Sequence, residues 1–290
     1  MMIAKHVISE ALTRLGGTAV LVAVGSAMLA AQTIVPAQAL LVTHVYKPTT
    51  ADSTLWRVEV ENTSRSVITA YGISLVCHYP DGTTINAGVT TIDLGPLLAG
   101  HAGLLAAVEY LRSAKPEVKL SAKRGEDPSF SPGATRSDAI SPPASPAGTA
   151  PDSVTAVPAL VITDDGRAAG DPDDVAGIFF RRHEDTMMRT MLLDHLRSVD
   201  ASADPAGALD ERLNSIASRA ETPQAAAKLL PGQTRILLDN PARRRGWLRD
   251  QLLLLKGRVG PSDHSGLAVT VRQYEAEAAA YERLAIYNAQ

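Results

Sequence analysis

Two runs of alternating apolar and polar residues lie between Trp56 and Gly82, and they constrain the fold more than any other part of the sequence. The apolar positions are Trp56, Val58 and Val60 in the first run and Tyr71, Ile73, Leu75, Cys77 and Tyr79 in the second. Successive side chains of a strand point to opposite faces, so each run predicts a strand with one buried face. Pro80-Asp81-Gly82 then predicts a tight turn, because proline fixes its own φ and glycine accepts a positive φ.

Further short runs of alternating or β-branched residues predict more strands around this pair. They cover residues 40–46, 83–94, 104–110, 118–120 and 154–162. Many short strands separated by turn signals are typical of a β-sandwich. The paired cysteines of an immunoglobulin domain are missing, so the sandwich is expected to be immunoglobulin-like in shape only. We therefore predict an antiparallel β-sandwich domain over residues 40–170.

Residues 121–152 interrupt this pattern with a stretch rich in serine, proline and glycine that has almost no large apolar residue. Such a composition cannot bury enough apolar surface to fold, so it predicts a disordered insertion. An isolated hairpin is marginally stable in water. The strand predicted at 154–162 is therefore expected to return to the first sheet across the insertion.

Residues 171–290 carry the signals of helices. Four capping residues each precede a proline, at Asp171-Pro172, Asp204-Pro205, Thr222-Pro223 and Asn240-Pro241. A capping side chain followed by proline at the first helical position predicts a helix start. The predicted fold class is thus α+β, with an N-terminal antiparallel β-sandwich followed by an all-helical C-terminal region.

Residues 1–39 predict export. Basic residues precede an apolar run, and Ala37-Gln38-Ala39 is a small-residue motif typical of signal-peptide cleavage. We predict cleavage after Ala39 and a periplasmic or secreted location. The alternative is an inner-membrane anchor that stays uncleaved, because no charged residue occurs from Leu15 to Thr43.

The composition bounds the class of partner. Proteins that bind nucleic acid usually carry a basic surface and aromatic residues on which bases stack. This chain has a net charge of -3 and only 4% aromatic residues, so a nucleic-acid partner is not expected. Cys77 is the single cysteine, and its place on the apolar face of a strand predicts a buried core residue. No motif implies a cofactor. The expected partner is a protein or an envelope polymer, with a membrane contact only if the N-terminal segment is uncleaved.

One helical segment concentrates the candidate acid–base groups, His183, Glu184 and Asp185, after two arginines. It lacks the spacing that places two histidine ligands on one helical face, so no metal site is predicted. We interpret the segment as a solvent-exposed helix face with an Asp185 to Arg189 pair. The alternative is an extracytoplasmic hydrolase that uses this helix or the residues of the 262–265 loop, Ser-Asp-His-Ser.

A basic cluster is the other candidate site, and it consists of Arg243, Arg244, Arg245 and Arg249. Positive charge in the first turn of a helix opposes the helix dipole. Either the acidic Asp239 or a bound anion or lipid headgroup is expected to compensate. The aspartates at 164–165 and 171–174 lack the spacing of a calcium loop, and we interpret them as turn and cap residues.

Several of these features together resemble a group of exported bacterial proteins to which no function is assigned. They are the signal, the Glu61-Asn62-Thr63-Ser64 corner, the hairpin at 165–171 and the charged helix from Pro172. The resemblance covers residues 40–200 and implies an extracytoplasmic β-sandwich with a helical extension. It transfers no catalytic residue. The predicted function is a structural or partner-binding module without catalytic activity.

Overall fold

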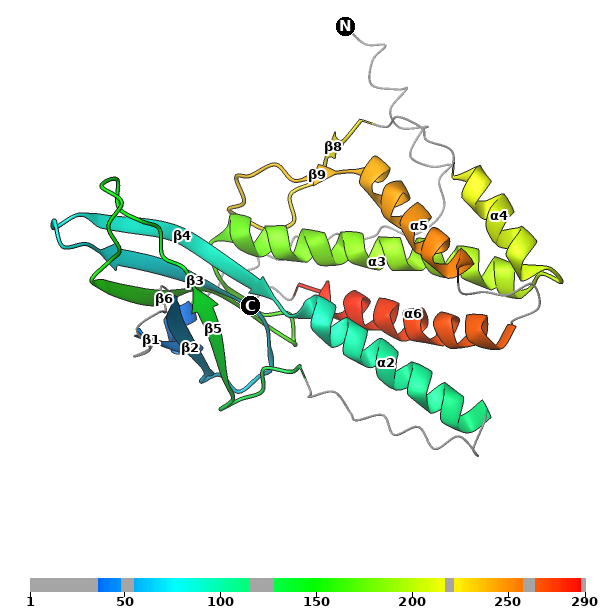
Figure 1. The fold of residues 1–290 in the computed structure, drawn as a ribbon, viewed down its shortest axis with the longest axis horizontal. Helices are drawn as coiled ribbons and strands as arrows, with labels where there is room; N and C mark the ends of the chain where they lie inside the picture. Colours follow the sequence, from blue (N-terminus) through cyan, green and yellow to red (C-terminus); the bar gives the residue numbers. More distant parts are fainter. Residues whose placement is uncertain (1–35, 48–54, 115–127, 217–221, 258–263, 288–290) are drawn as a thin grey trace, which may run out of the picture. The chain divides into compact units, whose positions relative to one another are not determined.

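The computed structural model describes residues 36–47, 55–114, 128–216, 222–257 and 264–287. All of them belong to one compact unit, Ile34–Gln290. Within it the fold is α+β, with antiparallel sheets and five α-helices among the described residues (Figure 1). The predicted signal segment as far as residue 35 and the strand predicted at 118–120 lie outside the described residues.

Two antiparallel sheets hold most of the strands. Sheet A has the order β1 (Leu41–Tyr46), β2 (Trp56–Asn62), β5 (Thr135–Ile140). Sheet B has the order β4 (Thr84–Asp93), β3 (Ile68–His78), β6 (Ser153–Thr163), β7 (Ala168–Gly170). Register shifts along β3 mark irregularities of the kind that bend a strand. The expected return of the 154–162 strand is confirmed, because β6 pairs with β3.

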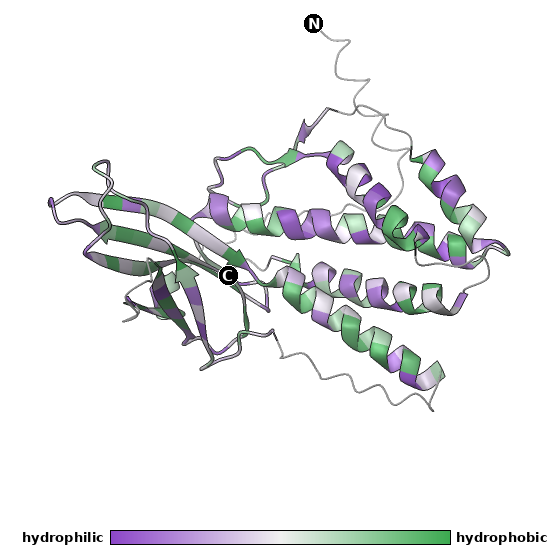
Figure 2. Ribbon diagram, viewed as in Figure 1, coloured by the Kyte–Doolittle hydropathy of each residue, from purple (hydrophilic) through white to green (hydrophobic). Residues whose placement is uncertain are grey.

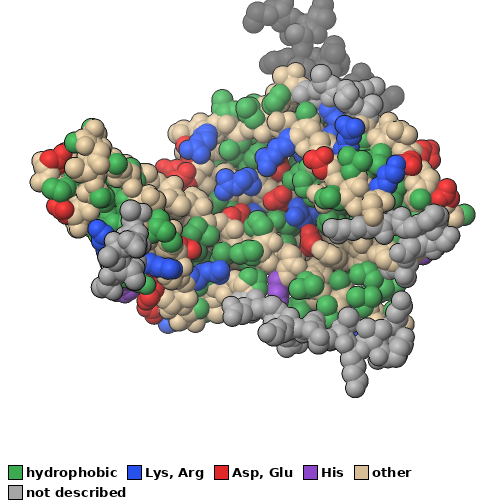
Figure 3. Space-filling model, in the orientation of Figure 1, with side chains coloured by type: hydrophobic (Ala, Val, Ile, Leu, Met, Phe, Trp, Pro, Cys, Tyr) green, Lys and Arg blue, Asp and Glu red, His purple; other side chains and the backbone are tan. Residues whose placement is uncertain are grey.

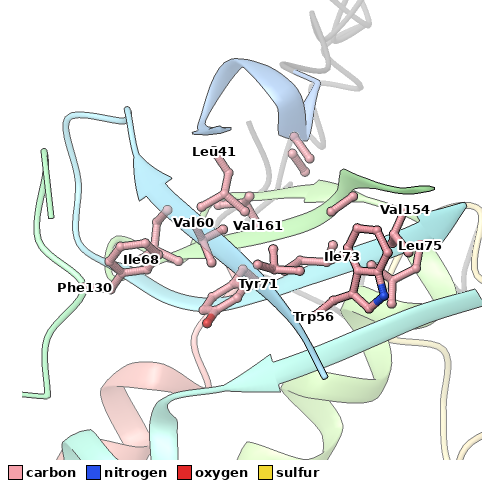
Figure 4. Packing of buried hydrophobic residues seen from close by; sticks show 14 of the residues in the cluster. Leu41, Trp56, Val60, Ile68, Tyr71, Ile73, Leu75, Phe130, Val154 and Val161 are labelled. Atoms are coloured by element: carbon pink, nitrogen blue, oxygen red, sulfur yellow. The ribbon is translucent and has the colours of Figure 1, made fainter. Parts of the chain in front are cut away.

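The two sheets contribute to one hydrophobic core, which Figure 4 shows from close by. Trp56 and Val60 from β2 meet Tyr71 and Ile73 from β3, and Val161 joins them from β6. The alternation seen in the sequence is confirmed in β2, where every second residue is buried. The prediction for Cys77 is also confirmed, because its side chain is fully buried in this core.

The prediction of a disordered insertion at 121–152 is wrong for residues 128–152, and its first part, 121–127, lies outside the described residues. Strand β5 pairs along its whole length with β2, and an edge strand needs only backbone partners, not a run of apolar residues. Phe130 is fully buried, packs against the ring of Tyr71, and its carbonyl accepts hydrogen bonds from Ile68 N and Asn62 Nδ2. One aromatic residue therefore anchors a segment whose average composition suggested a linker.

The helices are α2 (Gly95–Ala114), α3 (Pro172–Asp200), α4 (Pro205–Ser215), α5 (Pro241–Lys256) and α6 (His264–Leu284). Three of the four predicted proline starts are confirmed, at α3, α4 and α5. In each, the side chain before the proline accepts hydrogen bonds from backbone N–H groups of the first turn. These capped starts follow from sequence alone because the signal and the structure lie within four residues of each other.

The fourth predicted start, Thr222-Pro223, is wrong. The following residues form β8 (Gln224–Ala225), which pairs with β9 (Leu238–Asp239). The side chain of Gln233 accepts hydrogen bonds from the backbone N–H groups of Leu229 and Leu230, and Leu230 is buried. Local side-chain bonding and burial thus replace the helix that the capping pair suggested.

Helix α3 packs against different neighbours along its length. Its N-terminal half lies on sheet B, where Ile178 and Phe179 meet Leu160 and Ile162 of β6. Its C-terminal half joins α4, α5 and α6 in a second core that includes Leu192 and Leu196. Figure 2 shows that hydrophobic and hydrophilic residues alternate along α3, as expected for a helix that packs against different neighbours along its length.

Helix α2 replaces the strand predicted at 104–110, so that prediction is wrong, and helices also occur before residue 171. Small residues recur every four positions along it, at Gly95, Ala99, Gly103 and Ala107, and all four are buried. This face packs on α6. Glycine disfavours a helix and the alternation of apolar residues favours a strand, but close packing of the small residues on α6 stabilises the helix here. Among the described residues no helix is both long and apolar enough to span a bilayer.

Candidate functional site

Charged side chains of β4, α3, β9, α5 and α6 come together around the middle of α3, and we call them the ion-pair network. Its members are Asp93, Arg182, Glu184, Asp185, Arg189, Asp239, Arg243, Arg244 and Glu277. Arginine side chains lie beside carboxylates over the helical part of the face seen in Figure 3. The network contains Glu184 and Asp185 of the predicted polar segment, but not His183, and half of the predicted arginine cluster.

Arg182 is the most deeply buried member, with 1% of its surface exposed. Its Nε and Nη2 atoms donate to Asp93 Oδ1 at 3.1 and 2.7 Å. Nη2 also donates to the carbonyl of Thr69, and Nη1 donates to the carbonyl of Leu284. One guanidinium therefore ties β3, β4 and the end of α6 to α3. All of its nitrogens have acceptors, as a buried cation requires.

Arg189 forms a second node about two turns further along α3. It pairs with Asp185 at 3.4 Å and with Glu277 of α6 at 3.3 Å. Its guanidinium lies over the ring of Tyr281, 4.2 Å from the centroid, and 5.6 Å from that of Trp247. A cation between two aromatic faces and two carboxylates is stabilised by charge and by the ring quadrupoles.

Glu184 forms the third node, beneath the first turn of α5. It is 5% exposed, and its Oε1 atom lies 3.5 Å from Arg244 Nη1 without a hydrogen-bond partner in the described part of the chain. Arg243 lies 3.7 Å from the other oxygen. Arg244 also pairs with Asp239. The acidic compensation predicted for the arginines therefore comes from within the chain.

The network shifts the protonation of several members. Burial raises the pKa of Asp185, although the cationic Arg189 works against that shift. Burial also raises the pKa of Tyr281 to about 12. The hydrogen bond from Arg244 lowers the pKa of Asp239. Each shift has a structural cause in burial or pairing, which are the ordinary sources of shifted pKa values.

The interpretation of the 181–185 segment as a solvent-exposed face is wrong for Arg182 and Glu184, which are buried, and holds for His183, which is exposed. The predicted pair between Asp185 and Arg189 is confirmed. A single sequence cannot reveal the burial, because it depends on Asp93 and Glu277 from distant elements. The sequence did carry a partial signal of this burial. Arg182 lies four residues after the buried Ile178, and Glu184 lies four residues before the buried Met188, so each shares a helix face with an apolar residue.

The structure does not gather the other candidate groups into a site. Arg249 is exposed and Arg245 is half-buried on α5. In the 262–265 loop, Ser262 and Asp263 lie outside the described residues, while His264 Nδ1 lies 3.7 Å from Asp200. His195 is half-buried, and burial lowers its pKa.

The aspartates near the start of α3 act as turn and cap residues. Asp165 accepts a hydrogen bond from Thr163 inside the β6–β7 turn, and Asp171 accepts from the backbone of Asp173 and Asp174. Asp173 in turn accepts three hydrogen bonds from Thr234 and Arg235. The described residues contain no group of three potential metal ligands placed to hold an ion.

A pocket of about 280 Å³ lies away from the network, between the 63–66 corner, Leu40 and the β6–β7 hairpin. Arg65 and Arg167 are its charged lining residues. The guanidinium of Arg167 is already paired with Asp165 at 2.6 Å and donates to Ser66 Oγ. The charge of Arg167, one of the two positive charges at the pocket, is therefore neutralised by the chain itself.

The outer face of α2 is the apolar feature that the sequence reasoning missed. Leu97, Leu104 and Leu105 are 54%, 49% and 41% exposed. Figure 3 shows hydrophobic side chains gathered over this helix. The signal was the seven-residue spacing of leucines from Leu97 to Leu111, which the prediction of a strand at 104–110 concealed.

Comparisons with known proteins do not assign this arrangement to a family. The chain matches no protein-family model, no curated protein and no solved structure. Its function is therefore inferred from the ion-pair network and from the exposed face of α2.

Proposed function

We propose that the chain is an extracytoplasmic partner-binding module, in which the two sheets form an immunoglobulin-like sandwich and the helices present a docking surface. Export rests on the signal motif at residues 1–39, and the sandwich rests on the core that both sheets share. The resemblance to exported bacterial proteins points the same way. The partner is a protein, and the docking surface is α2.

The observation that carries the proposal is the exposed row of leucines on α2. The opposite face of the helix packs on α6 through small residues, so the leucines are held on a fixed support. Exposed apolar patches on folded proteins mark sites of interaction with other molecules. A rigid helix face also binds with a smaller entropy cost than a loop would.

The ion-pair network favours this proposal over the hydrolase alternative. Glu184 is engaged with Arg244 of α5, and Asp185 is engaged with Arg189, which also pairs with Glu277 of α6. A general base must reach the proton of a substrate, and a carboxylate that is buried beneath arginines is poorly placed to do so. The network therefore supports a scaffold that fixes α3, α5 and α6.

Site-specific crosslinking in cells that export the chain tests the proposal. A photoreactive amino acid at position 104 is expected to crosslink a protein, whereas the same residue at the exposed position 254 of α5 is not. Equal yields at both positions, or none at position 104, would contradict partner binding through α2. So would substrate turnover by the purified protein that is lost in His183→Ala or His264→Ala.

A further inference from the structure

Two kinds of residue recur along α2 with different spacings, and each kind defines a different face of the helix. Small residues at every fourth position face α6, as described above. Leucines recur at every seventh position on the opposite side, as Leu97, Leu104 and Leu111, with Leu105 beside Leu104, whereas Leu98 packs against the core that the two sheets share. Seven residues make two turns of a supercoiled helix, so leucines spaced in this way form a row that fits a second helix.

The charge of this face suits self-association. No Asp, Glu, Lys or Arg occurs from Leu94 to Val108, and the half-buried His101, one turn before Leu104, is the one titratable side chain in this span. When two identical surfaces meet across a two-fold axis, each charge near the axis meets its own copy, so an uncharged face avoids that repulsion. The two charged residues of the helix, Glu109 and Arg112, lie near its C-terminal end and are exposed.

We propose that the leucine face of α2 binds the α2 of a second copy of this chain, with Leu104, the middle of the row, near the two-fold axis. This proposal rests on the proposed function, because it names the partner of the same surface. Leu97 and Leu111 extend the contact on either side of Leu104. Val108 completes the row one helical turn after Leu104.

The chemistry of the face favours a second helix over a lipid surface. Helices that lie on membranes carry lysine or arginine along their polar edge and aromatic residues at the interface. Arg112 and Tyr110 are the residues of these types within α2, and both lie in its last two turns. The regular seven-residue spacing is a requirement of helix pairing and not of lipid contact.

The size of the face sets the strength of the contact. A single helix pair buries less than the ~1,600 Å² of a standard stable interface. The dimer is therefore expected to be weak and to depend on protein concentration.

Sedimentation velocity on the full exported chain, over about 1–300 μM, measures this equilibrium. The wild-type chain is expected to shift from monomer to dimer. Leu104→Glu and Leu104→Lys each place like charges at the axis and are expected to weaken dimerisation by at least about tenfold. Mixing the two variants brings opposite charges together and is expected to restore it. Leu254→Glu, at another exposed leucine, is the matched control and is expected to behave as wild type.

A covalent test uses the single native cysteine as its background. Cys77 is fully buried, so a cysteine introduced at an exposed position supplies the accessible thiol. Leu104→Cys is expected to oxidise to a covalent dimer at concentrations where Leu254→Cys stays monomeric. A disulfide needs Cα atoms within about 7 Å, so its formation reports on proximity to the axis.

The outcomes separate this inference from the proposed function. A wild-type chain that stays monomeric at the highest concentration overturns the second-copy proposal, and so does a dimer that the charge variants leave unchanged. In either case a crosslink from position 104 to a different protein still supports partner binding. A crosslinked species with twice the mass of the chain supports both.

Discussion

Arg182 and Asp93 meet beneath the middle of α3, where Nε and Nη2 of the arginine donate to one carboxylate oxygen at 3.1 and 2.7 Å. The two residues lie 89 positions apart in the sequence and belong to a helix and a sheet. Gly95 leaves the space that the pair needs, because a Cβ there would lie 3.0 Å from Asp93 Oδ1 and 3.2 Å from Arg182 Nε. The pair therefore fixes how α3 lies against the end of β4.

Breaking the Arg182 and Asp93 pair from one side is expected to cost more than removing both charges. Asp93→Asn leaves a buried guanidinium without its counter-charge, which destabilises the fold by about 3–5 kcal/mol. The double variant Arg182→Met/Asp93→Asn leaves no buried charge and is expected to cost less than the sum of the single changes. Urea unfolding of Asp93→Asn, Arg182→Met and the double variant measures these free energies.

The exposed pair between Arg167 and Asp165 is the control for that experiment. Both side chains are more than 40% exposed, so Arg167→Ala is expected to change the stability by about 1 kcal/mol or less. A cost for Asp93→Asn as small as that of Arg167→Ala would contradict the structural role given to Arg182.

Two glycines of α2 are expected to respond to alanine with opposite signs. A Cβ at Gly103 would lie 2.7 Å from Glu277 Cγ and 3.0 Å from Gln273 Cγ, so Gly103→Ala must displace Glu277 from Arg189. The expected net loss is about 1–3 kcal/mol, as for other overpacked sites. Gly100 has no atom within 4 Å of the same position, so Gly100→Ala is expected to stabilise the helix by about 0.5–1 kcal/mol.

Thermal unfolding of the two alanine variants checks this pair of predictions. Gly100→Ala is expected to raise Tm and Gly103→Ala to lower it. Both changes alter helix propensity equally, so the difference between them isolates the contact with α6. Equal shifts of the same sign would show that α2 does not pack closely on α6 at Gly103.

The raised pKa of Tyr281 predicts a loss of stability at high pH. Burial raises this pKa from 10.0 to about 12, so the folded state holds the phenolic proton more tightly than the unfolded state does. The stabilisation is complete below pH 10 and is lost as the pH rises through about 12. A shift of that size corresponds to roughly 2–3 kcal/mol.

Tyr281→Phe tests the pH dependence without a large change in volume. Its free energy of unfolding is expected to vary less between pH 10 and 12 than that of the wild type. Tyr46→Phe is the control, because Tyr46 is exposed and its removal is expected to leave the curve unchanged. Parallel curves for all three proteins would argue that the hydroxyl of Tyr281 is not buried in solution.

Elements defined by short-range signals could be predicted from the sequence. The alternation in β2 and in the second half of β3 predicts which side chains are buried, whereas both faces of β3 are buried from Ile68 to Ile73. The capped proline starts of α3, α4 and α5 lie within one turn of the residues that cause them. Cys77 follows from the same alternation, because its place on the strand decides that it is buried.

Elements decided by distant contacts could not be predicted in this way. Helix α2 contains residues that also fit a strand, and its packing on α6, more than 150 residues later, decides between the two. Strand β5 depends on the backbone of β2, and Phe130 depends on Tyr71. The ion-pair network likewise requires the positions of Asp93 and Glu277, which no local pattern in α3 can supply.

The turn before β1, Ala37–Ala39, contains the predicted cleavage site and also contacts the core. Ala37 is buried in the core that the two sheets share, and Gln38 Nε2 donates to the carbonyl of Pro158 in β6 at 3.1 Å. Cleavage after Ala39 would remove both contacts. A chain that begins at Leu40 is therefore expected to be less stable than one that begins at Pro36, by about 1–3 kcal/mol for one small apolar group and one hydrogen bond.

Gln38→Ala in the longer chain separates the two contributions, because it removes the hydrogen bond and leaves Ala37 in place. It is expected to account for about 1 kcal/mol of the difference. Equal stability of the two chains in urea would show that the turn does not contribute to the fold. If the turn does contribute, then a cut at the predicted site would lower the stability of the remaining chain, and the intact mass of the chain recovered from cells shows whether that cut is made.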